Sequence, residues 1–143
     1  MPATAHQLPT WECLELLQDH GIGRLCLVDG GYPIAVPINY RLLTGDAGAQ
    51  LVVRTLPDSM VGRYRGPCAL EVDEIDLAHG RAWSVIARGS VQPAHRSHAL
   101  PDPMPIVVGN RDRWMVIDVA VVSGRRFVLA EAADGCSVEW QLA

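Results

Sequence analysis

The chain has 143 residues, of which 49% are hydrophobic and 20% charged, so it is long enough to enclose one core and too apolar to be disordered. Its formal net charge of −4, without any basic run, argues against a nucleic-acid partner. None of its 12 basic residues is a lysine, which excludes a Schiff base with a pyridoxal cofactor. We therefore expect a single globular domain over residues 1–143.

The N-terminus lacks a basic segment followed by an apolar one, and no apolar run approaches the ~20 residues that cross a membrane. We expect a cytoplasmic protein without a membrane partner. Four scattered cysteines suggest neither a metal knuckle nor a short disulfide framework. They are Cys13, Cys26, Cys68 and Cys136, and we expect free thiols that are mostly buried.

The first element in chain order is a helix from Thr10 to His20, with Thr10 as a candidate N-cap and Gly21 just past its end. From Ile22 the hydrophobic pattern changes to that of strands. The segment GIGRLCLVD, a turn at Gly30 and Gly31, and the segment PIAVPINYR predict a β-hairpin.

The stretch from Pro37 to Thr55 reads PINYRLLTGDAGAQLVVRT and predicts two strands joined by a turn that contains Gly and Asp. Pro57 and Asp58 then favour the start of a short helix. The guanidinium of Arg54 and the first N–H groups of that helix, with Ser59, would suit a bound anion. We interpret this stretch as a phosphate site.

The rest of the chain predicts more strands. CALEVDEID alternates apolar and acidic residues, and a strand over residues 81–92 contains Gly89, which indicates a bulge. Residues 95–105 hold three closely spaced prolines and predict an irregular loop. Two further strands should flank a turn at Ser123 and Gly124. About seven antiparallel strands with two short helices predict a mainly β, closed barrel.

These segments together resemble the pyridoxamine 5′-phosphate oxidase-like, FMN-binding split-barrel family, in its small stand-alone form common in actinobacteria. The resemblance covers roughly residues 8–127. It rests on the order and spacing of LPTWECLELL, GIGRL, PINY, RT followed by DSM, LEVDEID, AWSVIARG and SGRRF.

The resemblance implies an antiparallel split barrel of six to eight strands, a homodimer, and FMN in two equivalent clefts between the subunits. It implies that Arg54, Thr55 and Ser59 bind the FMN phosphate. It also implies that the chain around Asn39 and Tyr40 lies along the isoalloxazine, and that Trp83 and Ser84 line the same cleft, from the partner subunit if not from their own. SGRRF implies a structural or interface role for Arg125 or Arg126.

One position departs from the family pattern. The family usually has a lysine directly after the serine, and this chain has Met60 there. Arg63, three residues further on, would face roughly the same side of a helix and could supply the missing charge. The site then either holds FMN through Arg54, Ser59 and Arg63 or holds no flavin.

Plainer interpretations exist for the same residues. Arg54 could be a solvated charge at a strand end, and Trp83 could be a core residue. His95 and His98 lie three apart but lack a third metal ligand nearby, so we expect surface histidines. No protein nucleophile with its base is evident, which leaves redox chemistry to a cofactor.

We thus expect an FMN-dependent oxidoreductase that acts on an unidentified small molecule. One alternative keeps the fold and uses the deazaflavin coenzyme F420. The other is a relative without flavin that binds other ligands or haem.

Overall fold

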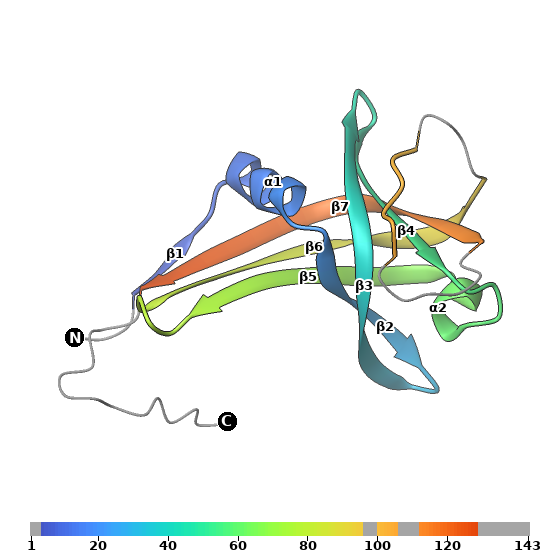
Figure 1. Cartoon of the computed structure of the whole chain (residues 1–143), viewed down its shortest axis with the longest axis horizontal. Coiled ribbons are helices and arrows are strands. Elements are labelled where there is room, and N and C mark those ends of the chain that lie inside the picture. The colour runs from blue at the N-terminus through green and yellow to red at the C-terminus, as the bar shows by residue number, and fades with distance from the viewer. Residues whose placement is uncertain (1–3, 96–99, 106–111, 129–143) are drawn as a thin grey trace.

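The computed structural model describes residues 4–95, 100–105 and 112–128. Most of these residues form strands, and the two helices are short (Figure 1). The elements in chain order are β1 (Thr4–Gln7), α1 (Thr10–Asp19), β2 (Ile22–Asp29), β3 (Tyr32–Gly45), β4 (Gly48–Thr55), α2 (Met60–Arg63), β5 (Gly66–Asp76), β6 (Arg81–Ala94) and β7 (Arg113–Val128).

Six of the strands close an antiparallel barrel. They are hydrogen-bonded in the order β7-β4-β3-β2-β5-β6, and β6 pairs again with β7 to complete the ring. One edge of β7 pairs with two different strands. Residues 113–118 of β7 pair with β4, and residues 125–128 pair with β1. The mainly β, antiparallel barrel with two short helices is confirmed. The short strand β1 is an element that the sequence pattern did not predict.

Helix α1 packs beside β7 and contributes Cys13 and Leu17 to the core. Its first residue is Thr10, whereas the N-cap position is Pro9, which offers no side-chain cap. The prediction of Thr10 as the N-cap is therefore wrong by one residue. The other anchor of the helix is Tyr40, which is fully buried and whose hydroxyl donates a 2.8 Å hydrogen bond to the carbonyl of Leu17.

Strand β7 runs without interruption through Ser123 and Gly124. The prediction of a turn there, with separate strands on either side, is wrong. Glycine has a packing role at this position, because a Cβ on Gly124 would lie 2.8 Å from Cys13 Sγ and 3.2 Å from Leu8 Cδ1. The missing side chain lets the start of the chain and α1 lie directly on the strand.

The bulge predicted at Gly89 is confirmed by a shift in the β6–β7 register between Arg88 and Gly89. At this bulge the two strands approach closely, and a Cβ on Gly89 would overlap the carbonyl oxygen of Asp118. Only glycine fits such an approach without displacing the neighbouring backbone. The bulge thereby sets which residues of β6 and β7 face outward beyond it.

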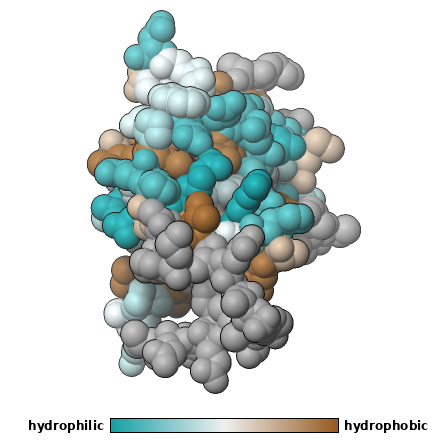
Figure 2. Space-filling view, turned by 90° about the vertical axis from the view of Figure 1, so that its left-hand side faces the viewer, coloured by the Kyte–Doolittle hydropathy of each residue, from teal (hydrophilic) through white to brown (hydrophobic). Residues whose placement is uncertain are grey.

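Large apolar residues also occur on the surface, where Trp11 and Tyr32 are 65% and 75% exposed. Figure 2 shows the β1 end of the molecule, on which hydrophilic side chains predominate around scattered hydrophobic ones. No helix within the described residues is long and apolar enough to cross a membrane.

Among the cysteines, Cys13 and Cys68 are buried and Cys26 is half-buried, all as free thiols, while Cys136 lies outside the described residues.

Candidate functional site

A pocket of about 450 Å³ lies where β4, β6 and β7 end together. Two arginines from neighbouring strands line it, Arg54 of β4 and Arg113 of β7. In the antiparallel register Arg54 pairs with Trp114 and Thr55 pairs with Arg113, so the two arginines belong to neighbouring pairs at the end of the sheet. The remaining lining residues are Pro57, Ala94, His95, Asp112 and Trp114. We call it the Arg54 pocket, and its two arginines make it a candidate site for an anion.

The guanidinium of Arg54 already contacts a carboxylate. Its Nη1 donates to both oxygens of Asp102, at 3.0 and 3.1 Å. The same group lies 5.0 Å from the ring centroid of Trp114, in a cation–π arrangement. Arg54 is therefore neither a freely solvated charge nor a core residue. It is oriented by an aromatic ring and bound to an anionic group of its own chain.

Thr55 and Ser59 form a second polar pair, on another face of β4. Consecutive residues of a strand point to opposite sides, so Thr55 follows Val53 toward the core while Arg54 points outward. The hydroxyl oxygens of Thr55 and Ser59 lie 2.9 Å apart. Ser59 also donates to the carbonyl of Leu56 at 2.7 Å. The three predicted phosphate ligands thus do not form one continuous cluster within the subunit.

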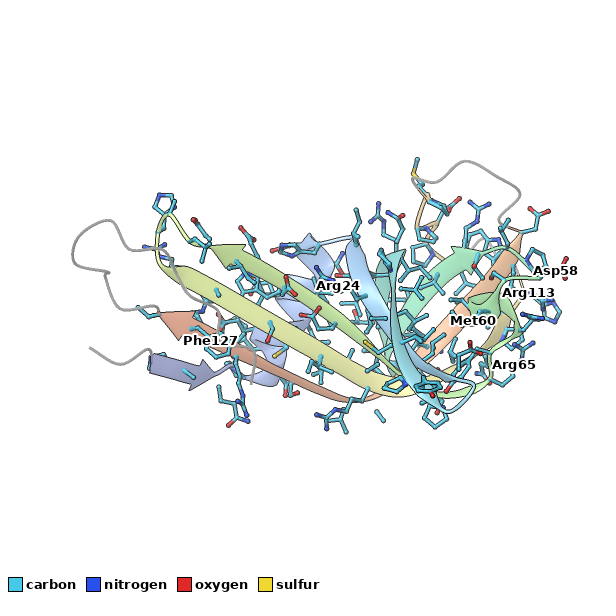
Figure 3. The ribbon with its side chains drawn as sticks, turned by 90° about the horizontal axis from the view of Figure 1, so that it is seen from below. Arg24, Asp58, Met60, Arg65, Arg113 and Phe127 are labelled. Carbon is cyan, nitrogen blue, oxygen red and sulfur yellow. The ribbon has the colours of Figure 1, made fainter. Side chains whose placement is uncertain are left out.

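Ser59 has a further structural role as the N-cap of α2, where its oxygen accepts the N–H of Gly62 at 3.0 Å. The helix begins later than predicted, at Met60 rather than near Pro57. Met60 is half-buried and Arg63 is exposed. Figure 3 shows Met60 and Arg113 at the same end of the molecule. The proximity of Met60 and Arg63 to a phosphate stays a prediction.

The two residues predicted to lie along an isoalloxazine differ in their surroundings. The side chain of Tyr40 is fully buried, and desolvation raises its pKa well above the ordinary tyrosine value. The Tyr40 side chain therefore faces the core of its own subunit, and a cofactor contact through the backbone at this position stays a prediction. Asn39 is half-buried beside Ile22 of β2. Its contact with a cofactor stays a prediction.

Trp83 and Ser84 lie far from Arg54 in the same subunit. Ser84 pairs with Arg125, whereas Arg54 pairs with Trp114, eleven positions earlier on β7. At ~3.3 Å per strand residue, about 35 Å separates the two pairs along the strand. The ring of Trp83 packs edge-on against His20, with centroids 4.7 Å apart. A cleft that contains both groups would need two subunits.

Sequence patterns alone did not single out Arg113 or Asp102 as site residues. Arg113 becomes a site residue only because β7 pairs with β4, and Asp102 lies 48 residues from Arg54 along the chain. His95, predicted as a surface residue, is exposed and lines the Arg54 pocket. His98 lies outside the described residues. Arg126 pairs with Glu12 of α1 at 2.6 Å, which gives it the structural role that the family pattern suggested.

Comparisons with known proteins agree with this fold. An FAD-binding protein from Mycobacterium smegmatis is 21% identical, with a TM-score of 0.68 over 87% of this chain and 99% of its own. A Corynebacterium diphtheriae protein of unknown function is 22% identical, with a TM-score of 0.70 over 87% and 98%. An FAD-binding protein from Mesorhizobium loti is 23% identical, with a TM-score of 0.61 over 88% and 98%.

No curated protein gives a significant match. The family model described as "Pyridoxamine 5′-phosphate oxidase", by contrast, matches residues 9–126. This range covers most of the chain, with β2 to β6 complete and all of β7 except its last two residues. The chain belongs to the pyridoxamine 5′-phosphate oxidase family of split-barrel proteins.

Proposed function

We propose that this protein binds a flavin, in the form of FMN, and acts as a flavin-dependent oxidoreductase on a small molecule. The observation that carries the proposal is the Arg54 pocket, which two arginines line and in which Arg54 already holds a carboxylate through two contacts. A carboxylate and a phosphate use the same guanidinium geometry. FAD-binding proteins among the structural neighbours support a flavin as the ligand.

The residues present fit a phosphate group. Arg54 and Arg113 supply two positive charges, and His95 adds a ring nitrogen at the same pocket. Asp102 stands where a phosphate oxygen would bind Arg54, so the phosphate has to displace it. Asp112 also lines the pocket and offsets part of the positive charge. We therefore expect moderate affinity, and Asp102 acts as an internal competitor of the cofactor.

The cleft in this proposal is formed by two copies of the chain. Arg54 and Ser84 are separated by eleven positions of β7 within one subunit, so they meet at one flavin only if each comes from a different subunit. In that arrangement Arg54 of one subunit holds the phosphate. Trp83 and Ser84 of the other subunit border the ring system, and each dimer contains two equivalent sites.

A bound flavin supplies the redox chemistry, because the described residues do not combine a nucleophile with a base. In this proposal the chain's own residues fix the position of the cofactor. Arg54 is held in place by the ring of Trp114, which limits the freedom of the guanidinium before any ligand binds. The protein thereby binds and orients the cofactor, and the reaction depends on which small molecule reaches the ring.

Subunit complementation tests the shared cleft. Arg54→Ala and Ser84→Trp should each weaken FMN binding as homodimers, because each damages both clefts. Mixed dimers contain one intact cleft and one with both changes, so co-expression of the two variants should restore tight binding at one site per mixed dimer. Fluorescence quenching of FMN measures the recovered sites. If verified mixed dimers do not recover FMN binding, the shared cleft is contradicted. Arg54 and Ser84 then either belong to one site within the same subunit or do not both contact the flavin.

A further inference from the structure

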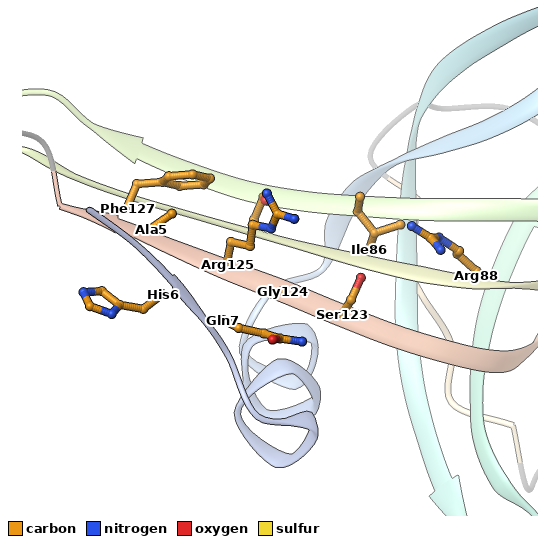
Figure 4. A pocket seen from close by; sticks show the side chains of 10 residues that line it. Ala5, His6, Gln7, Ile86, Arg88, Ser123, Gly124, Arg125 and Phe127 are labelled. Carbon is orange, nitrogen blue, oxygen red and sulfur yellow. The ribbon is translucent and has the colours of Figure 1, made fainter. Parts of the chain in front are cut away.

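A second pocket lies on the outer face of β6 and β7, at the β1 end of the barrel. Its volume is about 560 Å³. Three residues of β6 and three of β7 form its floor, namely Ser84, Ile86, Arg88, Ser123, Arg125 and Phe127. His6 and Gln7 of β1 border it (Figure 4). We call it the Arg88–Arg125 pocket.

Strand alternation explains why these side chains share one face. Val85 and Ala87 of β6 point into the core, so Ser84, Ile86 and Arg88 point outward. Gly124 of β7 faces helix α1, so its neighbours on the strand also point outward. The register places Ser84 opposite Arg125 and Arg88 opposite Val121. Arg88 and Arg125 therefore lie at the two ends of the pocket, with Ile86 between them.

The two arginines of this pocket have no carboxylate partner among the described residues. Other arginines of the barrel do, since Arg24 pairs with Glu71 and Asp73, and Arg126 pairs with Glu12 on the opposite face of β7. No acidic side chain lines the pocket within the described part of the chain. Figure 4 shows the guanidinium groups of Arg88 and Arg125 turned toward Ile86 from opposite sides.

We propose that the Arg88–Arg125 pocket binds the carboxylate or phosphate of a small organic anion. A guanidinium presents a planar pair of donors that suits both groups, and the hydroxyl of Ser123 adds a neutral donor between the arginines. Ile86 and Phe127 supply apolar surface for the rest of the ligand. The pocket is thus built for an anion with an apolar body, such as an aromatic acid or phosphate ester.

The pocket includes Ser84, which the proposed function places beside the flavin of the other subunit. The anion would then be the substrate, held next to the cofactor ring by arginines that do not hold the cofactor phosphate. This link to the reaction rests on the proposed function. The binding site itself is defined within one subunit and can be tested without any flavin.

Calorimetric titration of the flavin-free protein with phenyl phosphate, at low ionic strength, tests the site. Phenyl phosphate carries both the anion and an apolar ring, phenol carries only the ring, and inorganic phosphate only the anion. We expect one phenyl phosphate per chain, with weaker binding of inorganic phosphate and none of phenol. Arg88→Gln and Arg125→Gln should each weaken phenyl phosphate about tenfold or more, in the range for hydrogen bonds to charged groups.

Two control variants remove the same charge elsewhere. Arg81→Gln changes an exposed arginine of β6 outside the pocket, and Arg54→Gln tests the other anion pocket. Arg81→Gln should bind phenyl phosphate as the parent does, whereas Arg54→Gln should lose only the binding that takes place in the Arg54 pocket. The proposal fails if the parent shows no saturable binding, if Arg88→Gln and Arg125→Gln bind as tightly as Arg81→Gln, or if only Arg54→Gln loses binding.

FMN and riboflavin titrations of the same variants separate this inference from the proposed function. If Arg88→Gln and Arg125→Gln bind both flavins as the parent does, the two arginines contact the substrate and not the cofactor. A loss of FMN affinity with unchanged riboflavin affinity would assign the two arginines to the cofactor phosphate and overturn the inference. A parent that binds phenyl phosphate but no flavin would overturn the proposed function alone.

Discussion

Replacing Arg54 with alanine should weaken FMN binding by a moderate amount. A hydrogen bond to a charged group is worth ~1.5–3 kcal/mol. The free energy of the Arg54–Asp102 contact must be subtracted from this value, because the phosphate has to displace that carboxylate before it binds Arg54. The ion pair is partly exposed, with side-chain exposures of 22% and 42%, so it contributes about 0.5–1 kcal/mol. We expect a net loss of about 1–2 kcal/mol, or roughly five- to thirtyfold in Kd.

Asp102→Asn provides the matched test. It keeps the size of the side chain and removes the competing charge, so FMN should bind about two- to fivefold more tightly. In the Arg54→Ala background the same change should have little effect, because the carboxylate has lost its cation. The non-additivity of the two changes measures their coupling. Riboflavin lacks the phosphate, and its affinity should be unchanged in all three variants.

Fluorescence quenching of each flavin at fixed ionic strength gives the Kd values. Circular dichroism of each variant checks that the fold is retained. Equal FMN affinity in the parent and Arg54→Ala would show that Arg54 only anchors Asp102. An equal loss for FMN and riboflavin would refute the phosphate assignment, because the effect would then come from a general change at the cleft.

Three further changes test other parts of the structure. Burial raises the pKa of Glu71 to about 7, above its reference value of 4.5, so the native state retains a proton that the unfolded chain has lost. The free energy of unfolding should therefore fall as the pH rises from about 4.5 to 7, and Glu71→Gln should remove this dependence in denaturant titrations. Gly89→Ala should cost ~1–3 kcal/mol in thermal unfolding, because its Cβ meets the carbonyl of Asp118, whereas Gly45→Ala has open space around it. Met60→Lys should tighten FMN by up to ~1–2 kcal/mol and leave riboflavin unchanged, and equal gains for both flavins would show that the lysine does not reach the phosphate.

Local sequence patterns predicted most of the barrel, because its strands and turns are encoded over a few residues. The turn at Gly30 and Gly31 followed from glycine's conformational freedom, and both residues have positive φ angles. The bulge at Gly89 followed from its missing side chain, which lets the two strands approach closely. The prediction of a turn at Gly124 was wrong for a physical reason. The sequence does not distinguish a glycine that forms a turn from a glycine that makes room for a packed helix. Only the position of α1 in the fold shows that Gly124 is of the second kind.

The candidate site was less predictable, because strand pairing and long-range contacts create it. Arg54 was identified from its place at a strand end, but its partner Asp102 belongs to an irregular segment far along the chain. Tyr40 was assigned to the cofactor by resemblance, although its hydroxyl anchors α1 from inside the core. The Arg88–Arg125 pocket depends on the outward faces of two paired strands, which the bulge sets.

The central claim is that two copies of this chain bind FMN in clefts that they share. Gel filtration of the protein mixed with FMN, followed by light scattering and absorbance at about 450 nm, tests it most directly, because that band belongs to the flavin itself. We predict one peak at about twice the 15.5 kDa chain mass that carries one flavin per chain. A monomer that elutes free of flavin at micromolar concentration would contradict the claim.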